Sequence, residues 1–143
     1  MPFAEIYLRD GTTPEYRKAI SAGIHQSMIE VFQIPEDDFF HVIHSLPAEN
    51  MLHAPVFWGI GRSDESVIIR MTFNVRPAEQ KKALFTTIAD RLVENPGLRR
   101  DDILMTILET AAENWWSTAR TIDPETGFDT RMSPEAVRAG TIN

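Results

Sequence analysis

The feature that most constrains the fold of this chain is a repeat of its sequence at an offset of 64 residues. The offset separates two stretches that show the same order of strand and helix patterns, which indicates duplication of a strand–helix–strand unit rather than a solenoid of short repeats. Eight pairs of residues are identical at this offset: Glu15 and Glu79, Lys18 and Lys82, Ala19 and Ala83, Ile24 and Ile88, Glu30 and Glu94, Asp37 and Asp101, Asp38 and Asp102, and Ile43 and Ile107.

The first unit is predicted over residues 2–46. Residues 2–8 read as a strand, and the sequence Thr12-Thr13-Pro14-Glu15 supplies N-cap threonines, a proline suited to the first helical position and a glutamate placed for a capping box. The helix is expected to end near Phe32, and residues 39–46 are rich enough in aromatic and branched side chains to form a second strand. The apolar stripe of this helix is predicted to consist of Ile20, Ile24, Met28 and Val31.

The second unit is predicted over residues 67–110. Residues 67–75 alternate between apolar and other side chains, which is typical of a strand. A helix follows Pro77, Asn95-Pro96-Gly97 ends it, and a fourth strand begins at Ile103. We therefore predict an α+β fold in which two βαβ units form a four-stranded sheet with two helices on one face. Residues 47–66 suggest a short hairpin, the domain is expected to span residues 1–119, and residues 120–143 are expected to form a C-terminal tail.

The composition excludes several classes of function. A formal net charge of -7 and a pI near 5.0 argue against nucleic-acid and anionic-membrane partners, which require a basic surface. The chain has no cysteine, no apolar run long enough for a membrane helix and no visible secretory signal, so a cytoplasmic location is expected. The histidines and glycines show no metal-ligand or nucleotide-binding spacing, and no cofactor is expected.

The predicted topology brings distant residues to one edge of the sheet. The two strands of a βαβ unit are parallel, and two units joined by an approximate twofold axis run antiparallel to each other. Pro2 and Asp38 precede strands of the first unit, whereas Arg76 and Trp115 follow strands of the second. We therefore expect these four residues to lie close together.

Pro2 and Arg76 are the residues with the clearest chemistry. Removal of Met1, which is usual before a small second residue, would leave Pro2 with a free secondary amine, and an apolar pocket with neighbouring cations would lower the pKa of that amine toward neutrality. Arg76 precedes a helix N-terminus, where an anion is favoured, and can bind a carboxylate bidentately. If Met1 is retained, the Pro2 nitrogen is an amide and cannot act as a base.

Three further residues are candidates for binding the substrate, and Asp38 is a third candidate catalytic residue. Trp115 and Trp116 are candidates for the pocket wall, or alternatively for the core or a subunit interface. Arg70 is a candidate second cation, although pairing with an acidic residue at an interface is favoured for it. Asp38 is a candidate for orienting a water molecule or the Pro2 ammonium group, or alternatively ends a loop as Asp102 does.

Taken together, these motifs resemble the tautomerase superfamily, and most closely its malonate semialdehyde decarboxylase-like branch. The resemblance covers residues 2–117. It depends on Pro2, on Asp38 after Ile34-Pro35, on Arg76-Pro77-Ala78-Glu79-Gln80-Lys81-Lys82, and on Glu113-Asn114-Trp115.

The resemblance implies a homotrimer that needs no cofactor. It implies that Pro2 is the catalytic amine, Arg76 the arginine that binds and polarises a small carboxylate substrate, Asp38 the acid near the proline, and Trp115 a pocket wall. Asn74 stands where the decarboxylase has a further arginine, which disfavours decarboxylation more than enol–keto tautomerisation.

Three functions remain open from the sequence. The first is enol–keto tautomerisation of a small keto, enol or unsaturated carboxylic acid, with Pro2 as general acid or base. The second is a malonate semialdehyde decarboxylase or hydratase reaction with protonated Pro2, and the third is an inactive trimeric scaffold. The trimer is also expected from a sheet face that no helix covers, which is predicted to carry Ala4, Ile6, Leu8, Phe40, Val42 and Ile68.

Overall fold

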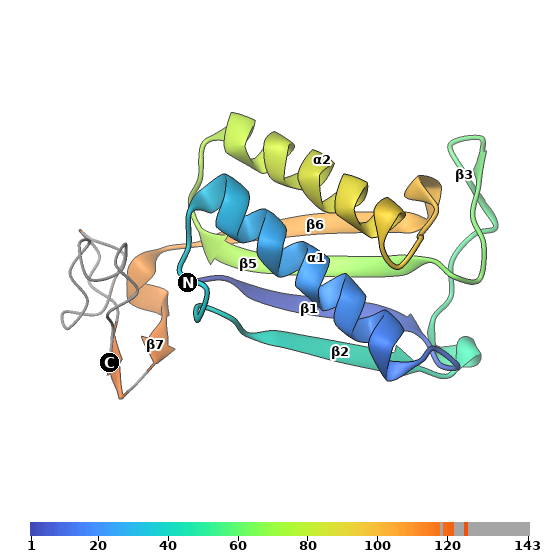
Figure 1. The fold of residues 1–143 in the computed structure, drawn as a ribbon, viewed down its shortest axis with the longest axis horizontal. Coiled ribbons are helices and arrows are strands. Elements are labelled where there is room, and N and C mark those ends of the chain that lie inside the picture. The colour runs from blue at the N-terminus through green and yellow to red at the C-terminus, as the bar shows by residue number, and fades with distance from the viewer. Residues whose placement is uncertain (118, 122–124, 126–143) are drawn as a thin grey trace.

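The computed structural model describes residues 1–117, 119–121 and 125, and for Arg120 and Thr121 only the backbone. Two helices lie side by side across one face of a four-stranded sheet (Figure 1). The predicted fold class is confirmed. The helices are α1 (Pro14–Phe32) and α2 (Ala78–Glu94), and the sheet strands are β1 (Phe3–Arg9), β2 (His41–Leu46), β5 (Val67–Asn74) and β6 (Ile103–Thr110).

The sheet has the strand order β2-β1-β5-β6. β1 pairs in parallel with β2, β5 pairs in parallel with β6, and the two units meet where β1 pairs antiparallel to β5, with Ile6 opposite Ile69. The predicted duplication is visible in the elements themselves, because β1 and β5, α1 and α2, and the short 3₁₀ turns Ala48–Asn50 and Ala112–Asn114 begin 64 positions apart. The starts of β1 and β2 therefore lie at the same sheet edge as the ends of β5 and β6.

Local sequence explains the limits of α1. Thr13 is the N-cap, its hydroxyl accepts a hydrogen bond from Tyr16 N at 3.1 Å, and Pro14 occupies the start of the helix. Glu15 is therefore one position too early to complete a capping box on Thr13. The helix ends at Gln33, whose φ of 56° places it in the left-handed region that usually calls for glycine.

The core lies between the helices and the sheet. β5 alternates strictly, with Val67, Ile69, Met71 and Phe73 all at most 1% exposed, and each such buried aliphatic or aromatic side chain contributes about 1.5–3 kcal/mol through removal from water. Ala4, Ile6 and Leu8 of β1 also belong to this core, at most 2% exposed. Their predicted place on the uncovered face is therefore wrong, because β1 presents its odd-numbered side chains there instead.

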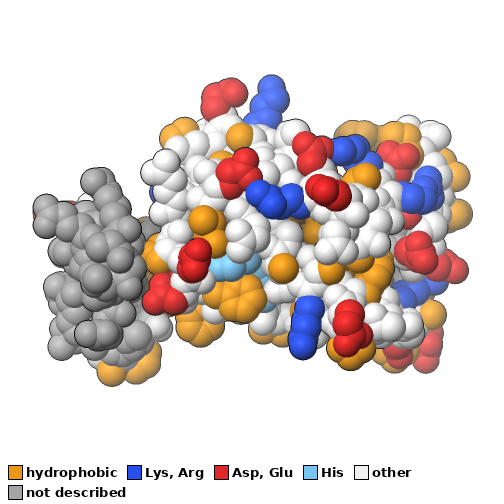
Figure 2. Space-filling model, in the orientation of Figure 1, with side chains coloured by type: hydrophobic (Ala, Val, Ile, Leu, Met, Phe, Trp, Pro, Cys, Tyr) orange, Lys and Arg blue, Asp and Glu red, His pale blue; other side chains and the backbone are white. Residues whose placement is uncertain are grey.

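The uncovered face nevertheless carries many apolar groups. Phe40 is 56% exposed and Val42 42% exposed at the β2 edge, and Leu104 and Leu108 of β6 are about equally exposed, at 41% and 40%. In its centre, the Tyr7 ring stacks on His44 and the Tyr7 hydroxyl donates to Glu5. The helical face differs, since acidic and basic side chains are interspersed over it (Figure 2).

The predicted hairpin within residues 47–66 is confirmed. β3 (Val56–Phe57) and β4 (Ile60–Gly61) form it, and it projects from the end of the molecule opposite the N-terminus (Figure 1). After β6, short strands β7 (Trp116–Ser117) and β8 (Arg120–Thr121) pair antiparallel. The expected C-terminal tail, residues 120–143, lies outside the described residues apart from the backbone of Arg120 and Thr121 and from Glu125. Among the helices of the described part, none is long and apolar enough to cross a membrane.

Candidate active site

The chain start, Asp38 and Arg76 meet at one end of the sheet, as the topology predicts. The Met1 α-amine lies 3.6 Å from Asp38 Oδ2, and Pro2 is buried beside it. A cavity of about 520 Å³ opens here. Its described lining consists of Met1, Phe32, Gln33, Ile34, Pro35, Asp38, Asn74, Val75, Arg76, Thr110, Ala111, Ala112, Glu113 and Glu125.

Asp38 belongs to a loop that is held to α1 by backbone and side-chain bonds. The Asp38 amide donates to Pro35 O at 3.1 Å, which closes a tight turn before β2. His25 Nε2 donates to the Glu36 carbonyl at 2.8 Å, so the loop is fixed to a buried residue of α1. These bonds place the Asp38 carboxylate opposite the N-terminal amine rather than leaving it in a free loop.

Arg76 is held between the end of β5 and the start of α2. Its backbone N–H donates to Glu109 Oε2 at 2.8 Å, and Lys81 pairs with the other oxygen of that carboxylate. Its guanidinium carbon lies 4.9 Å from the centre of the Phe32 ring, a cation–π geometry. Arg76 Nε is buried and has no hydrogen-bond partner among the described residues. The terminal guanidinium nitrogens make no hydrogen bond or ion pair to a described residue, so they remain available to a ligand in the cavity that Arg76 lines.

The electrostatics of these groups are coupled. Burial lowers the pKa of the Met1 α-amine; Asp38 opposes this effect and Arg76 adds to it. Burial also raises the pKa of Asp38, although the positive charge of the nearby amine acts to lower it. Burial lowers the pKa of the Arg76 guanidinium, although the negative charge of Asp38 acts to raise it. An amine placed here is therefore shifted from its ordinary pKa toward the range where it can exchange protons at neutral pH.

Trp115 reaches the site through Asn74. Trp115 Nε1 donates to Asn74 Oδ1 at 2.7 Å, and Asn74 lines the cavity. Trp116 is 71% exposed and does not line it. Arg70 lies on the uncovered face of the sheet, with its Nε 3.9 Å from Oε2 of Glu5, an acidic residue of the same chain. Its pairing with an acidic residue at a subunit interface stays a prediction.

Several contributors were not anticipated from the sequence. Phe32 was expected only as the end of a helix, and Glu109 and His25 were given no part in the site. A charged residue at a helix-facing position of an alternating strand was the available signal for Glu109. No group of three or more His, Cys, Asp or Glu side chains in the described part of the chain is arranged to hold a metal ion.

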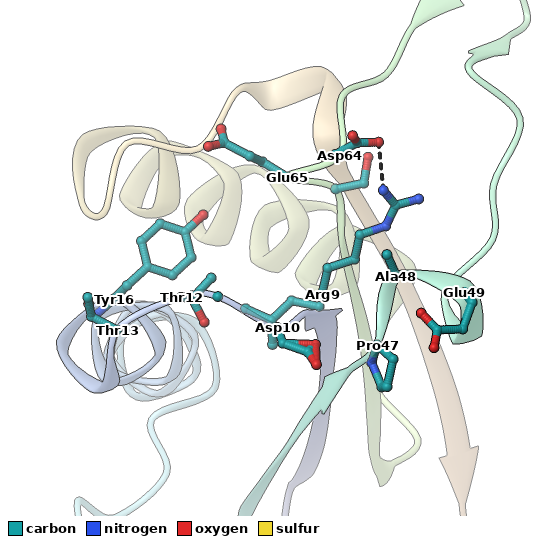
Figure 3. Close-up of a pocket in the computed structure, with 13 residues that line it drawn as sticks. Arg9, Asp10, Thr12, Thr13, Tyr16, Pro47, Ala48, Glu49, Asp64 and Glu65 are labelled. Carbon is teal, nitrogen blue, oxygen red and sulfur yellow. Dashed lines mark hydrogen bonds and ion pairs between the residues drawn. The ribbon is translucent and has the colours of Figure 1, made fainter.

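A second cavity of about 990 Å³ lies at the opposite end of the sheet (Figure 3). Its charged lining is mainly acidic: Asp10, Glu49, Asp64 and Glu65. Arg9 is its one described arginine, and its guanidinium is already paired with Asp64 at 2.7 Å, as the dashed line in Figure 3 shows. This cavity is therefore poorly suited to a carboxylate, and the smaller cavity is the better candidate for an anionic substrate.

Comparison with known proteins agrees with this geometry. A family profile described as "Tautomerase enzyme" matches residues 38–117, and a second profile with the same description matches residues 2–59. The chain belongs to the tautomerase superfamily. It is 37% identical over 116 residues to the "Probable tautomerase YusQ" of Bacillus subtilis (strain 168), covering 80% of this chain and 91% of that protein.

Solved structures support the same assignment. The FG41 malonate semialdehyde decarboxylase inhibited by 3-bromopropiolate superposes with a TM-score of 0.75 at 27% identity, covering 80% of this chain and 87% of that one. This likeness supports the malonate semialdehyde decarboxylase-like branch. A fused 4-OT described as a symmetric trimer shares the fold, with a TM-score of 0.68 at 13% identity over 86% of this chain and 96% of that one.

Proposed function

We propose that this chain catalyses enol–keto tautomerisation of small carboxylic acids, with the amine of Pro2 as the proton carrier after removal of Met1. The observation that carries this proposal is the meeting of the chain start, Asp38 and Arg76 on one cavity. No cofactor is part of the proposed mechanism.

Each residue has a distinct role in this mechanism. Arg76 binds the substrate carboxylate through its free donors. The Pro2 amine transfers a proton to or from the carbon next to the carbonyl group. Asp38, whose charge opposes the lowering of the Met1 amine pKa by burial, orients the ammonium form. Phe32 holds the guanidinium from its other side.

The test is an assay of enol ketonisation on phenylpyruvate enol. We expect Pro2→Ala and Arg76→Ala each to lower kcat/KM by at least about a hundredfold, the low end for positioned acid–base groups. N-terminal mass spectrometry must first show that Met1 is absent. Melting curves of both variants should stay close to wild type, and Pro2→Ala with full activity would exclude the mechanism.

A decarboxylase or hydratase reaction is the second candidate. It is supported by the superposition on malonate semialdehyde decarboxylase and by Asp38, whose charge favours a protonated amine. In that reaction the protonated Pro2 amine would polarise a carbonyl group rather than remove a proton. Carbon dioxide release from malonate semialdehyde at a rate above that of phenylpyruvate ketonisation would favour this candidate.

We also propose that the protein is a homotrimer. The uncovered sheet face carries Phe40, Val42, Leu104 and Leu108, all at least 40% exposed, and large apolar side chains gathered on one face are typical of an interaction surface. Packing three sheets around an axis would bury it. The fused 4-OT trimer provides a precedent for the fold.

A further inference from the structure

The hydrogen bond between Trp115 and Asn74 fixes which atoms Asn74 can offer a ligand. An indole nitrogen only donates hydrogen bonds, so the amide atom 2.7 Å from Trp115 Nε1 must be the oxygen. The other branch of the amide is then the NH₂ group with its two donors. No described residue accepts a hydrogen bond from that nitrogen, and Asn74 lines the cavity together with Arg76.

The cavity therefore offers two donors of different charge. Arg76 carries a full positive charge and is the only cationic side chain among the described lining residues. Asn74 stands two positions earlier and is neutral, and the other ionisable side chains of the described lining are the acids Asp38, Glu113 and Glu125. A ligand that fits this arrangement has one carboxylate for Arg76 and one uncharged oxygen for Asn74, because a second carboxylate would find no second cationic side chain among the described lining residues.

We infer that Asn74 binds the carbonyl or enol oxygen of the substrate, so that the preferred substrates are 2-oxo acids with a single carboxylate and their enols. Trp115 is the positioning residue that keeps the amide nitrogen toward that oxygen. This inference rests on the proposed function, whose acid–base group and carboxylate anchor are Pro2 and Arg76. It adds the residue that recognises the second oxygen and the class of substrate.

The chemistry assigns Asn74 a role that changes during the reaction. In ketonisation, the protonated amine gives a proton to C3, the C2–C3 double bond becomes a single bond, and the enol O–H loses its proton to water while its oxygen becomes the carbonyl. The amine regains a proton from water, so the reaction is an isomerisation that consumes no net proton. A donor on the oxygen stabilises the negative charge that develops there before the carbonyl forms.

The test uses two ligands that differ only in the second oxygen. Phenylpyruvate has the carbonyl group next to its carboxylate, whereas 3-phenylpropionate has a methylene there. Isothermal titration calorimetry should show that the wild type binds phenylpyruvate about fivefold to tenfold more tightly, the range of one neutral hydrogen bond. Asn74→Leu and Asn74→Ala should abolish this preference and leave the affinity for 3-phenylpropionate within about twofold.

Trp115→Phe keeps an aromatic ring but removes the N–H that orients the amide. It should lower the preference for phenylpyruvate and the kcat on its enol, while the affinity for 3-phenylpropionate, which offers the carboxylate alone, stays within about twofold of wild type. Trp58→Phe on the hairpin, 89% exposed and remote from the cavity, is the matched control and should behave as wild type. Asn74→Asp should weaken the binding of both ligands, because it places a negative charge beside the ligand carboxylate.

The outcomes separate this inference from the proposed function. An unchanged preference in folded Asn74→Leu and Asn74→Ala overturns the role of Asn74 even if Pro2→Ala abolishes catalysis. Loss of the preference in these variants, in a protein that shows no tautomerase activity, supports the binding role and refutes the proposed reaction. Tighter binding of a dicarboxylate such as 2-oxoglutarate than of phenylpyruvate by the wild type overturns the predicted substrate class.

Discussion

His41 should make the stability of this protein depend on pH in a way that one substitution removes. His41 is the first residue of β2 and its side chain faces α1. Ser21 Oγ lies 2.9 Å from His41 Nδ1, and the centres of the Phe39 and His41 rings are 4.5 Å apart. Burial, and secondarily the neighbouring His25, lower the pKa of His41 from 6.5 to about 4. The folded protein therefore holds this imidazole neutral over a range in which the unfolded chain protonates it.

The sign and size of the effect follow from that difference. Because the pKa is depressed on folding, the stabilising contribution is complete above pH 6.5 and is lost as the pH falls toward 4. A depression of 2.5 units corresponds to about 3.4 kcal/mol at most, from 1.36 kcal/mol per unit. His41 is only partly buried, so solvent screening reduces this, and we expect a loss of about 2 kcal/mol between pH 7 and pH 4.

The assay is urea unfolding of wild type and His41→Gln at a series of pH values. Glutamine retains a group that can hydrogen-bond Ser21 but does not titrate, so the difference between the two curves isolates His41 from the carboxylates that also titrate in this range. The free energy of unfolding of wild type should fall by about 2 kcal/mol more than that of the variant. Parallel curves, or an NMR titration of the His41 ring with a midpoint near 6.5, would refute the reasoning.

The remaining predictions concern stability and assembly. Asp102→Ala should lower the free energy of unfolding by about 2–3 kcal/mol, because Asp102 is 1% exposed and accepts hydrogen bonds from Ser63 N and Oγ that would lose their partner; an unchanged urea midpoint would contradict this. Gln33→Gly should raise the melting temperature, since a side chain at a φ of 56° costs about 1–2 kcal/mol, of which the greater chain entropy of glycine offsets about 0.5–1 kcal/mol. Light scattering should give about three times the chain mass of 16.3 kDa for wild type, and Leu104→Glu should reduce it toward one chain with the helical circular dichroism retained.

Much of the architecture could be predicted because local signals agreed with the global fold. The strict alternation of β5 and the Thr13-Pro14 start of α1 each specify one element. The parallel geometry of a βαβ unit then fixes which strand ends share an edge. That geometry alone was sufficient to predict that Asp38 and Arg76 lie close to the chain start.

The face of β1 could not be read from the sequence. Phe3 and Tyr7 alternate with Ala4, Ile6 and Leu8, so both faces of the strand are apolar and the period of two gives no direction. Packing of the helices decides the matter, since they cover the smaller aliphatic side chains and leave the aromatic ones on the other face.

Contacts between elements were also beyond the sequence. Glu109 binds the Arg76 backbone and the Lys81 side chain, and no sequence pattern over the separation of 33 positions between Arg76 and Glu109 indicates the contact. The contact between the Phe32 ring and the Arg76 guanidinium also could not be predicted from the sequence. It requires the C-terminus of α1 to lie beside the N-terminus of α2.

The duplication brings an equivalent set of positions to the opposite end of the sheet. At the 64-residue offset, Ser66 corresponds to Pro2, and both stand immediately before a central strand. Thr12 and Asp10 correspond to Arg76 and Asn74, and all of Ser66, Thr12 and Asp10 line the larger cavity. The two cavities are therefore related by the approximate twofold axis of the fold.

Their chemistry is nevertheless opposite. Ser66 lies within the chain, so its nitrogen is a peptide nitrogen that donates to Ser63 O at 3.3 Å and has no lone pair for a proton. Asp102, the equivalent of Asp38, is enclosed by hydrogen bonds from Ser63 and Ser66 instead of facing an amine, and these bonds lower its pKa although burial acts to raise it. In the described part of the chain, the free amine lies at the start of the first unit, and Arg76, for which we propose carboxylate binding, follows β5 of the second. Acid–base chemistry on a carboxylate is therefore expected at one end of the sheet, and neither unit alone holds both groups.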